Sequence, residues 1–285
     1  MKRNPSGAVP HQNTDDCKTK YPLLFLHGIG FRDGKKYNYW GRIPGILKEH
    51  GAQIFYGGQS VCGTIPSNAL FLKEKIREIL HVTNAGKINI IAHSKGGLEA
   101  RYLISSLHMA ECVASLTTIA TPHLGSKSME WLLRDHPGIM RLVTGLFDLE
   151  ARLLGDQHPE SKKAFCEVTP ESMSAFNKEN PDAPEVFYQS YAFAMKQPSS
   201  DFLFSLFNHI IDKREGPNDG LVSTSSAQWG EFKGVVTGKT NRGISHMDAT
   251  DLRRRQFSKG AQGEGVEDIT AFYLALVRGL KEKGY

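Results

Sequence analysis

A serine that closely follows an apolar run and is separated from two glycines by a single residue is the strongest chemical signal in this 285-residue chain. Residues 88–91 (INII) indicate a buried strand, Ser94 follows after Ala92 and His93, and Lys95-Gly96-Gly97 opens a segment with helical periodicity. A strand, a sharp turn and a helix in this order form a nucleophile elbow, which raises the serine hydroxyl above the sheet at a helix N-terminus. Ser94 is therefore the predicted nucleophile. Ala92 stands where the usual pattern has a glycine, and the alternative is an ordinary strand-to-helix turn.

A serine nucleophile needs a base and an acid that orients the base, and on this kind of fold they follow the serine in the order Asp or Glu, then His. Asp219 lies in the turn sequence Pro-Asn-Asp-Gly, and His246 lies in a late loop-like stretch. Taken alone, Asp219 could be a common turn residue and His246 a surface or core histidine. Their order favours a triad of Ser94, Asp219 and His246. The rival acids are Asp201, Asp212, Asp248 and Asp251, and the rival bases are His209 and His123.

Two backbone N–H groups are candidates to bind the negative oxygen that forms during acyl transfer. One belongs to Lys95, the residue after the serine, and the other should come from a loop after an early strand. The apolar run 23–26 leads into His27-Gly28-Ile29-Gly30, whose glycines permit a close backbone approach. Ile29 is therefore the second predicted donor, and a plain strand-to-loop turn is the alternative.

Strand-like and helical segments alternate along most of the chain, which predicts an α/β fold with a mostly parallel central sheet flanked by helices. The strand-like runs are 23–26, 53–56, 88–91, 115–119, 186–193 and 234–236. The alternation breaks at about 126–185, where mostly helical sequence predicts a cap or lid insertion. Residues 129–154 are unusually apolar, which favours a lid that covers Ser94 in water and turns outward at a lipid surface. A static helical cap is the alternative.

Several motifs together resemble the bacterial family I triacylglycerol lipases of the Pseudomonas, Burkholderia and Proteus type. The resemblance runs from about Lys20 to the C-terminus and implies the α/β-hydrolase fold, lipase activity, and Ser94, Asp219 and His246 as the triad. It also implies Ile29 and Lys95 as oxyanion donors, with no cofactor for catalysis. The motifs are Tyr21-Pro22 with His27-Gly28, His93 to Gly97 with Arg101-Tyr102, Ser115 to Ile119 with Thr121 to Ser126, Asn218 to Val222, and His246 to Asp248.

The same resemblance implies a structural calcium ion near His246. Asp248 matches one carboxylate ligand of that family, and Asp201 is the preferred candidate for the second, with Asp212 next. In the family, backbone carbonyls of the loop after the histidine also bind the ion. Calcium prefers six or more oxygen ligands. The alternative role for Asp248 is to complement the dipole at the start of a helix. Ser225 stands where the Pseudomonas and Burkholderia members carry a cysteine, so their disulfide is not expected here.

Composition predicts one globular domain over 21–285, preceded by a flexible extension over 1–20 without the apolar stretch of a secretory signal. No run is long enough to span a membrane, so a soluble protein is expected, and its compartment stays open. The net charge of +5 includes Arg253-Arg254-Arg255, for which a solvated helix face is favoured over an anionic partner. No nucleic-acid motif is present. The expected partner is an ester or lipid substrate at a lipid–water interface.

The predicted function is carboxylic ester hydrolysis through an acyl-enzyme, with triacylglycerols as the favoured substrates. A phospholipase, a polyester hydrolase or an acyltransferase could use the same machinery. A non-catalytic binding protein on this fold is the remaining alternative, and it would be expected to have lost a triad position.

Overall fold

All strands of the central sheet run parallel in the computed structural model, which describes residues 15–30, 38–153, 155–156, 159–255 and 264–285. Within these residues the sheet order is β2-β1-β3-β4-β5-β6. Each predicted strand is present, with boundaries that differ by no more than a few residues. The strands are β1 (Leu23–Leu26), β2 (Ile54–Tyr56), β3 (Ile88–His93), β4 (Val113–Ile119), β5 (Phe187–Phe193) and β6 (Glu231–Val236).

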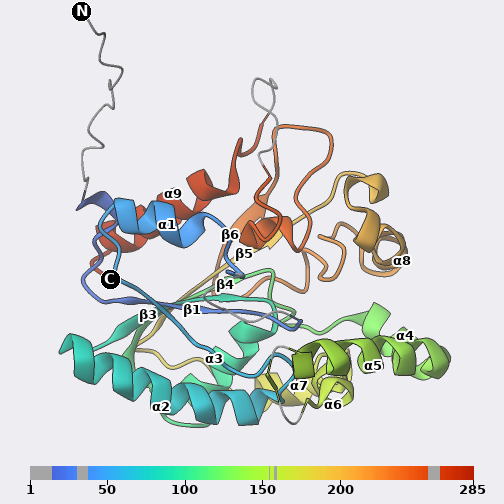
Figure 1. Cartoon of the computed structure of the whole chain (residues 1–285), viewed down its shortest axis with the longest axis horizontal. Helices are drawn as coiled ribbons and strands as arrows, with labels where there is room; N and C mark the ends of the chain where they lie inside the picture. The colour runs from blue at the N-terminus through green and yellow to red at the C-terminus, as the bar shows by residue number, and fades with distance from the viewer. Residues whose placement is uncertain (1–14, 31–37, 154, 157–158, 256–263) are drawn as a thin grey trace, which may run out of the picture.

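The side chains of β1 alternate between two hydrophobic cores, one on each face of the sheet. Leu23 and Phe25 pack in a core with α1 (Ile43–Glu49) and α9 (Ile269–Glu282). Leu24 and Leu26 face the other core, which contains α2 (Ile65–Thr83) and α3 (Lys95–Ser105). Figure 1 shows these helix pairs on opposite sides of the sheet. Because both faces are covered, β1, β3 and β4 are buried at every residue, as expected of a parallel sheet.

The segment between β4 and β5 is helical, as predicted. Figure 1 shows it as a group of helices beside one end of the sheet. Helix α8 (Ser205–Glu215) follows β5 and precedes β6 in the chain, and it contacts α4 (Lys127–Asp135). The helices of the insertion are α4 (Lys127–Asp135), α5 (Pro137–Leu153), α6 (Ser161–Cys166) and α7 (Pro170–Glu179). Leu154, the last residue of the predicted apolar segment, lies outside the described residues.

The predicted N-terminal extension is packed over its last residues, contrary to expectation. Residues 1–14 lie outside the described part of the chain, whereas η1 (Asp15–Cys17) packs against α9. The Cys17 side chain is fully buried, and Lys20 N–H donates to the carbonyl of Tyr285. The polar composition of this segment predicted flexibility. The buried thiol of Cys17 and the ion pair of Asp16 with Arg278 instead attach the segment to α9.

Short 3₁₀ helices complete the described structure, and three of them lie in the loops discussed below. The chain of 198–204 contains η3 (Pro198–Ser200) and η4 (Phe202–Phe204), and η5 (Asp248–Thr250) follows the loop after β6. The remaining one, η2 (Ala110–Cys112), precedes β4. None of the described helices is long and apolar enough to cross a membrane.

The close approach of α3 to β1 predicts that Gly96→Ala destabilises the protein although alanine favours helices. A Cβ at Gly96 would lie 2.6 Å from the backbone oxygen of His27, so the backbone would have to move. We expect a loss of about 1–3 kcal/mol in the free energy of unfolding, measured in urea. The control Gly86→Ala meets no atom within 4 Å and should change it by less than about 0.5 kcal/mol. Equal stabilities for the two variants would contradict the packing described here.

Candidate active site

The backbone at Ser94 has the strained conformation expected of a nucleophile elbow. Its dihedral angles are φ 52° and ψ −129°, a region that residues with a side chain rarely adopt. The Ser94 N–H donates to the carbonyl of Ile119 at the end of β4 (2.9 Å). The Ser94 carbonyl accepts a hydrogen bond from the hydroxyl of Thr121 (2.8 Å). These two bonds hold the turn between β3 and α3, and the Ser94 side chain stays half-buried at the end of the sheet.

The turn after β1 lies directly against this elbow. A Cβ at Gly28 would lie 2.8 Å from the Cβ of Ser94, so only glycine allows the approach. Ile29, the next residue, is half-buried, and Gly30 follows with φ 100°. Lys95 is the first residue of α3, and its N–H therefore has no acceptor within the helix. The structure thus brings the two predicted oxyanion donors to the same end of the sheet as the serine.

Asp219 and His246 are hydrogen-bonded to each other in two ways. The imidazole Nδ1 donates to Asp219 Oδ2 (2.7 Å), and the His246 N–H donates to the Asp219 carbonyl (2.8 Å). The other carboxylate oxygen of Asp219 accepts from the N–H groups of Leu221 (2.9 Å) and Val222 (2.8 Å). Asp219 is fully buried, so these bonds satisfy a charge that water cannot reach. Because Nδ1 is bonded to the carboxylate, Nε2 is the imidazole nitrogen of His246 that could accept a proton.

The imidazole of His246 lies beside that of His93, the residue before the serine. Their ring centroids are 4.3 Å apart. The hydroxyl of Tyr39 accepts from Gly28 N–H (3.2 Å) and is hydrogen-bonded to His93 Nδ1 (2.7 Å), which connects the turn after β1 to this pair. Burial, together with the neighbouring His246, holds the pKa of His93 well below its usual value, so His93 stays uncharged. Within the residues that the structure describes, no hydrogen bond joins the Ser94 hydroxyl to His246.

Sequence reasoning did not find the roles of Tyr39 and His93. The one signal for His93 is its position directly before the predicted nucleophile. Tyr39 gives no such signal, since its contacts with Gly28 and His93 are made across the fold.

A buried ion pair lies under the elbow. The ammonium of Lys95 contacts the carboxylate of Glu99 one helical turn later, and both side chains are only 3% exposed. Asn68 donates to the same carboxylate (2.7 Å), and Gln59 donates to it (3.3 Å) and to the carbonyl of His27 (3.1 Å). This network connects the residue after the serine to the end of β1.

The residues proposed for calcium do not fit that ion. Both carboxylate oxygens of Asp201 accept hydrogen bonds from the guanidinium of Arg253, and Oδ2 also accepts from the hydroxyl of Ser245 (2.7 Å). Asp248 is buried nearby, with Oδ1 unpartnered, and its N–H points to the same Ser245 hydroxyl (3.4 Å). Asp212 lies within α8. No group of three or more metal-binding side chains occurs among the described residues. The charge of Asp201 is already neutralised by the guanidinium of Arg253.

The same ion pair corrects the prediction for the basic cluster. The chain around Arg253, Arg254 and Arg255 is a turn and a loop, not a helix, and Arg253 is directed to a buried acid. Hydrogen bonds from Arg253 and Ser245 outweigh the effect of burial, which by itself raises the pKa of Asp201, and the net pKa lies below its usual value. Nothing in a run of three arginines indicates that one of them forms an ion pair with an acid 52 residues earlier, as Arg253 does with Asp201.

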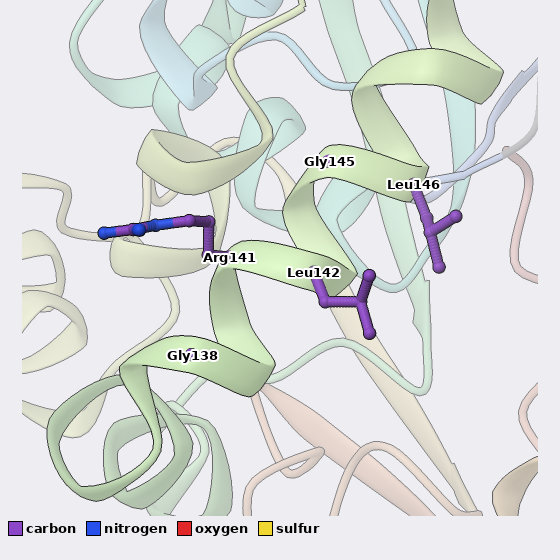
Figure 2. Close-up of a pocket in the computed structure, with 5 residues that line it drawn as sticks. All are labelled: Gly138, Arg141, Leu142, Gly145 and Leu146. Carbon is purple, nitrogen blue, oxygen red and sulfur yellow. The ribbon is translucent and has the colours of Figure 1, made fainter.

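Helix α5 borders the site on the side of Ile29. A Cβ at Gly30 would lie 2.9 Å from the ring of Phe147, so this helix rests on the turn after β1. Its outer face carries exposed apolar side chains, with Leu142 66% and Leu146 59% exposed. Figure 2 shows both leucines projecting from the same side of α5. They line an open hollow of about 400 Å³. The other exposed apolar residues of this face are Ile139, Leu149 and Leu153.

Comparisons with known proteins agree with this architecture. A family described as "Putative serine esterase (DUF676)" matches residues 68–134. A triacylglycerol lipase of Pseudarthrobacter phenanthrenivorans is 30% identical over 325 residues, covering 93% of this chain and 98% of that protein. Triacylglycerol lipase 2 of Saccharomyces cerevisiae is 28% identical over 262 residues, covering 87% and 74%. A crystal structure of a mature Bacillus licheniformis lipase superimposes with a TM-score of 0.65 at 19% identity, covering 86% and 91%. The predicted α/β-hydrolase fold is confirmed.

The buried ion pair predicts that Glu99→Gln destabilises the protein strongly. The substitution removes the counter-charge that directly contacts the buried ammonium of Lys95, which costs about 3 kcal/mol in the free energy of unfolding. The matched control is Glu78→Gln in the exposed pair with Lys75 on α2, for which a loss below about 1 kcal/mol is expected. Urea denaturation measures both. A loss at Glu99 no larger than that at Glu78 would show that the pair is not buried as described.

Proposed function

We propose that this chain, which belongs to the triacylglycerol lipase family and is a serine ester hydrolase, uses Ser94, His246 and Asp219 as its catalytic triad. The observation that carries the proposal is the hydrogen bond between Asp219 and His246. The imidazole of His246 lies beside the ring of His93, which directly precedes the strained, half-buried Ser94. The fixed contact of Nδ1 with the carboxylate directs the second imidazole nitrogen to act as the base. Hydrogen bonds of this kind often tighten only when substrate is bound.

In the proposed mechanism, Nε2 of His246 takes the proton of Ser94 as its oxygen attacks the ester carbonyl. The carbonyl oxygen becomes negative and accepts hydrogen bonds from the N–H groups of Ile29 and Lys95. His246 then gives its proton to the departing alcohol, which leaves an acyl group on Ser94. Water, activated by the same imidazole, releases the acid. Asp219 stabilises the imidazolium in both steps, and the neutral His93 does not repel it.

The motifs around Ser94, Asp219 and His246 support a finer assignment to the bacterial family I type. Its favoured substrates are triacylglycerols presented at a lipid–water interface. Apolar side chains on α5 supply a surface for such a contact, and Phe202, Leu203 and Leu206 add exposed apolar area on η4 and α8. Water-exposed apolar groups in such number are costly unless they meet another apolar phase.

Helix α5 is the proposed lid. Its inner side chain Phe147 touches Gly30, while its outer leucines face solvent. Movement of α5 at a lipid surface would thus uncover the turn that carries Ile29, where the substrate carbonyl is expected to bind. Contact with lipid and access to the serine are then coupled through one helix.

Removal of the Ser94 hydroxyl should abolish ester hydrolysis. Ser94→Ala is expected to lower kcat on a soluble p-nitrophenyl ester by about a million-fold, because the acyl-enzyme cannot form. The matched control is Ser105→Ala at the far end of α3, which should retain full activity. Stopped assays at high enzyme concentration with both proteins measure the difference. Substantial residual turnover by Ser94→Ala would refute the assignment of the nucleophile.

Polar substitution on the outer face of α5 should affect lipid substrates selectively. Leu142→Ser with Leu146→Ser should lower the rate on triacylglycerol emulsions at least several-fold and leave hydrolysis of a short soluble ester unchanged, because both side chains already face water. Leu70→Ser with Phe71→Ser, on the exposed face of α2, is the control and should change neither rate. An emulsion rate that matches this control would contradict the proposed role of α5.

A further inference from the structure

We propose that the guanidinium of Arg253 is a built-in cation that fixes the loop carrying His246, in the place where a bound metal ion would otherwise be needed. The inference rests on the proposed catalytic role of His246 and assigns Arg253 as a positioning residue. It concerns a segment without regular secondary structure, since only η5 interrupts the loop between β6 and α9 in the part described. Such a loop needs side-chain contacts to hold one geometry.

Asp201 is the centre of these contacts. Its side chain is 1% exposed, and it lies between η3 and η4, in the chain that follows β5. Oδ1 accepts from Arg253 Nη2 (2.8 Å) and from the Leu203 N–H (3.2 Å). Oδ2 accepts from the Ser245 hydroxyl (2.7 Å) and from Arg253 Nη1. Each oxygen therefore has two donors, and the carboxylate has no free position for another ligand.

These bonds hold the loop on both sides of the histidine. Ser245 directly precedes His246, and Arg253 follows His246 after η5. The carboxylate of Asp201 therefore binds the loop both before and after the histidine. A two-pronged contact from a planar guanidinium also fixes orientation, which a point charge does not. Arg253 is 17% exposed at its side chain, so the pair is largely shielded from water.

A second guanidinium secures the end of the same loop. Arg42 donates to both oxygens of Asp251 (2.8 and 2.7 Å) and to Asp268 at the start of α9 (2.7 Å). The loop is thus fastened by arginine–carboxylate pairs to the chain after β5 and to the chain before α1.

The charges explain why a divalent ion is not required. Asp201 is neutralised by Arg253, and a calcium ion would have to displace that guanidinium to reach the carboxylate. Asp248 also lies beside Ser245. Its buried Oδ1 has no hydrogen-bond partner among the described residues. Among the described residues, Asp248 thus offers calcium one unpartnered carboxylate oxygen, and the second carboxylate that the resemblance implies is already paired with Arg253.

Thermal unfolding in EDTA and in millimolar calcium chloride tests the inference directly. The wild-type Tm should be the same in both within about 1 °C, because no ion binds the folded state. Arg253→Gln should lower the Tm by roughly 4–8 °C, since it leaves Asp201 buried without its partner. Arg253→Lys should recover part of that loss, because an ammonium supplies the charge but not the two-pronged contact. The matched control Arg254→Gln removes the same charge from an exposed neighbour and should shift the Tm by less than about 2 °C.

Kinetics on a soluble ester give the second readout. Arg253→Gln, assayed well below its Tm, should lower kcat about tenfold and change KM less than about twofold, because a displaced imidazole slows chemistry more than binding. Arg254→Gln should leave both constants unchanged. Calcium stabilisation of the wild type, or equal Tm and kcat for the two arginine variants, would overturn the inference. The thermal measurements need no turnover, so failure of the proposed function would show separately as an inactive wild type.

Discussion

The left-handed backbone at Ser94 is the constraint around which the site is assembled. Such a conformation costs about 1–3 kcal/mol, and it persists because Ile119 and Thr121 hold both peptide groups of the turn. The elbow also leaves little room, so the turn after β1 can approach only through Gly28, and α3 can approach β1 only through Gly96. The strained residue and its close neighbours thus require glycine at both positions, and the turn that carries Ile29, a proposed oxyanion donor, lies against the elbow.

The other two residues of the proposed triad come from loops, and polar contacts between loops determine where they lie. Asp219 is fixed by its own turn through Leu221 and Val222, and His246 is fixed to Asp219 by backbone and side chain. The residues after His246 depend on Arg253 and Arg42, which pair with buried acids from distant parts of the chain. Each of these carboxylates would be costly if left alone, so the fold is stable only when the loops are in place. Stability and geometry of the site are therefore linked.

The sequence predicted those features that arise from local patterns. Residues 23–26 form β1 as expected because four consecutive apolar residues suit a strand covered on both faces, and the periodicity from Ile269 onward predicted α9. Ser94 and Asp219 lie in short motifs whose turn geometry follows from adjacent residues. The pairing of Arg253 with Asp201 and the contacts of Tyr39 join residues far apart in sequence, and nothing in the local sequence marks them. Burial of Cys17 was missed for the same reason, since its partners belong to α9.

A crystal structure of the protein after reaction with diethyl p-nitrophenyl phosphate would test the central claim most directly, because the phosphoryl group resembles the tetrahedral intermediate. The account predicts phosphorus bonded to Ser94 Oγ, with one phosphoryl oxygen accepting hydrogen bonds from the N–H groups of Ile29 and Lys95. It also predicts Nε2 of His246 within hydrogen-bonding distance of Ser94 Oγ or of an adduct oxygen. Phosphorus on another residue, or a phosphoryl oxygen directed away from both N–H groups, would contradict it.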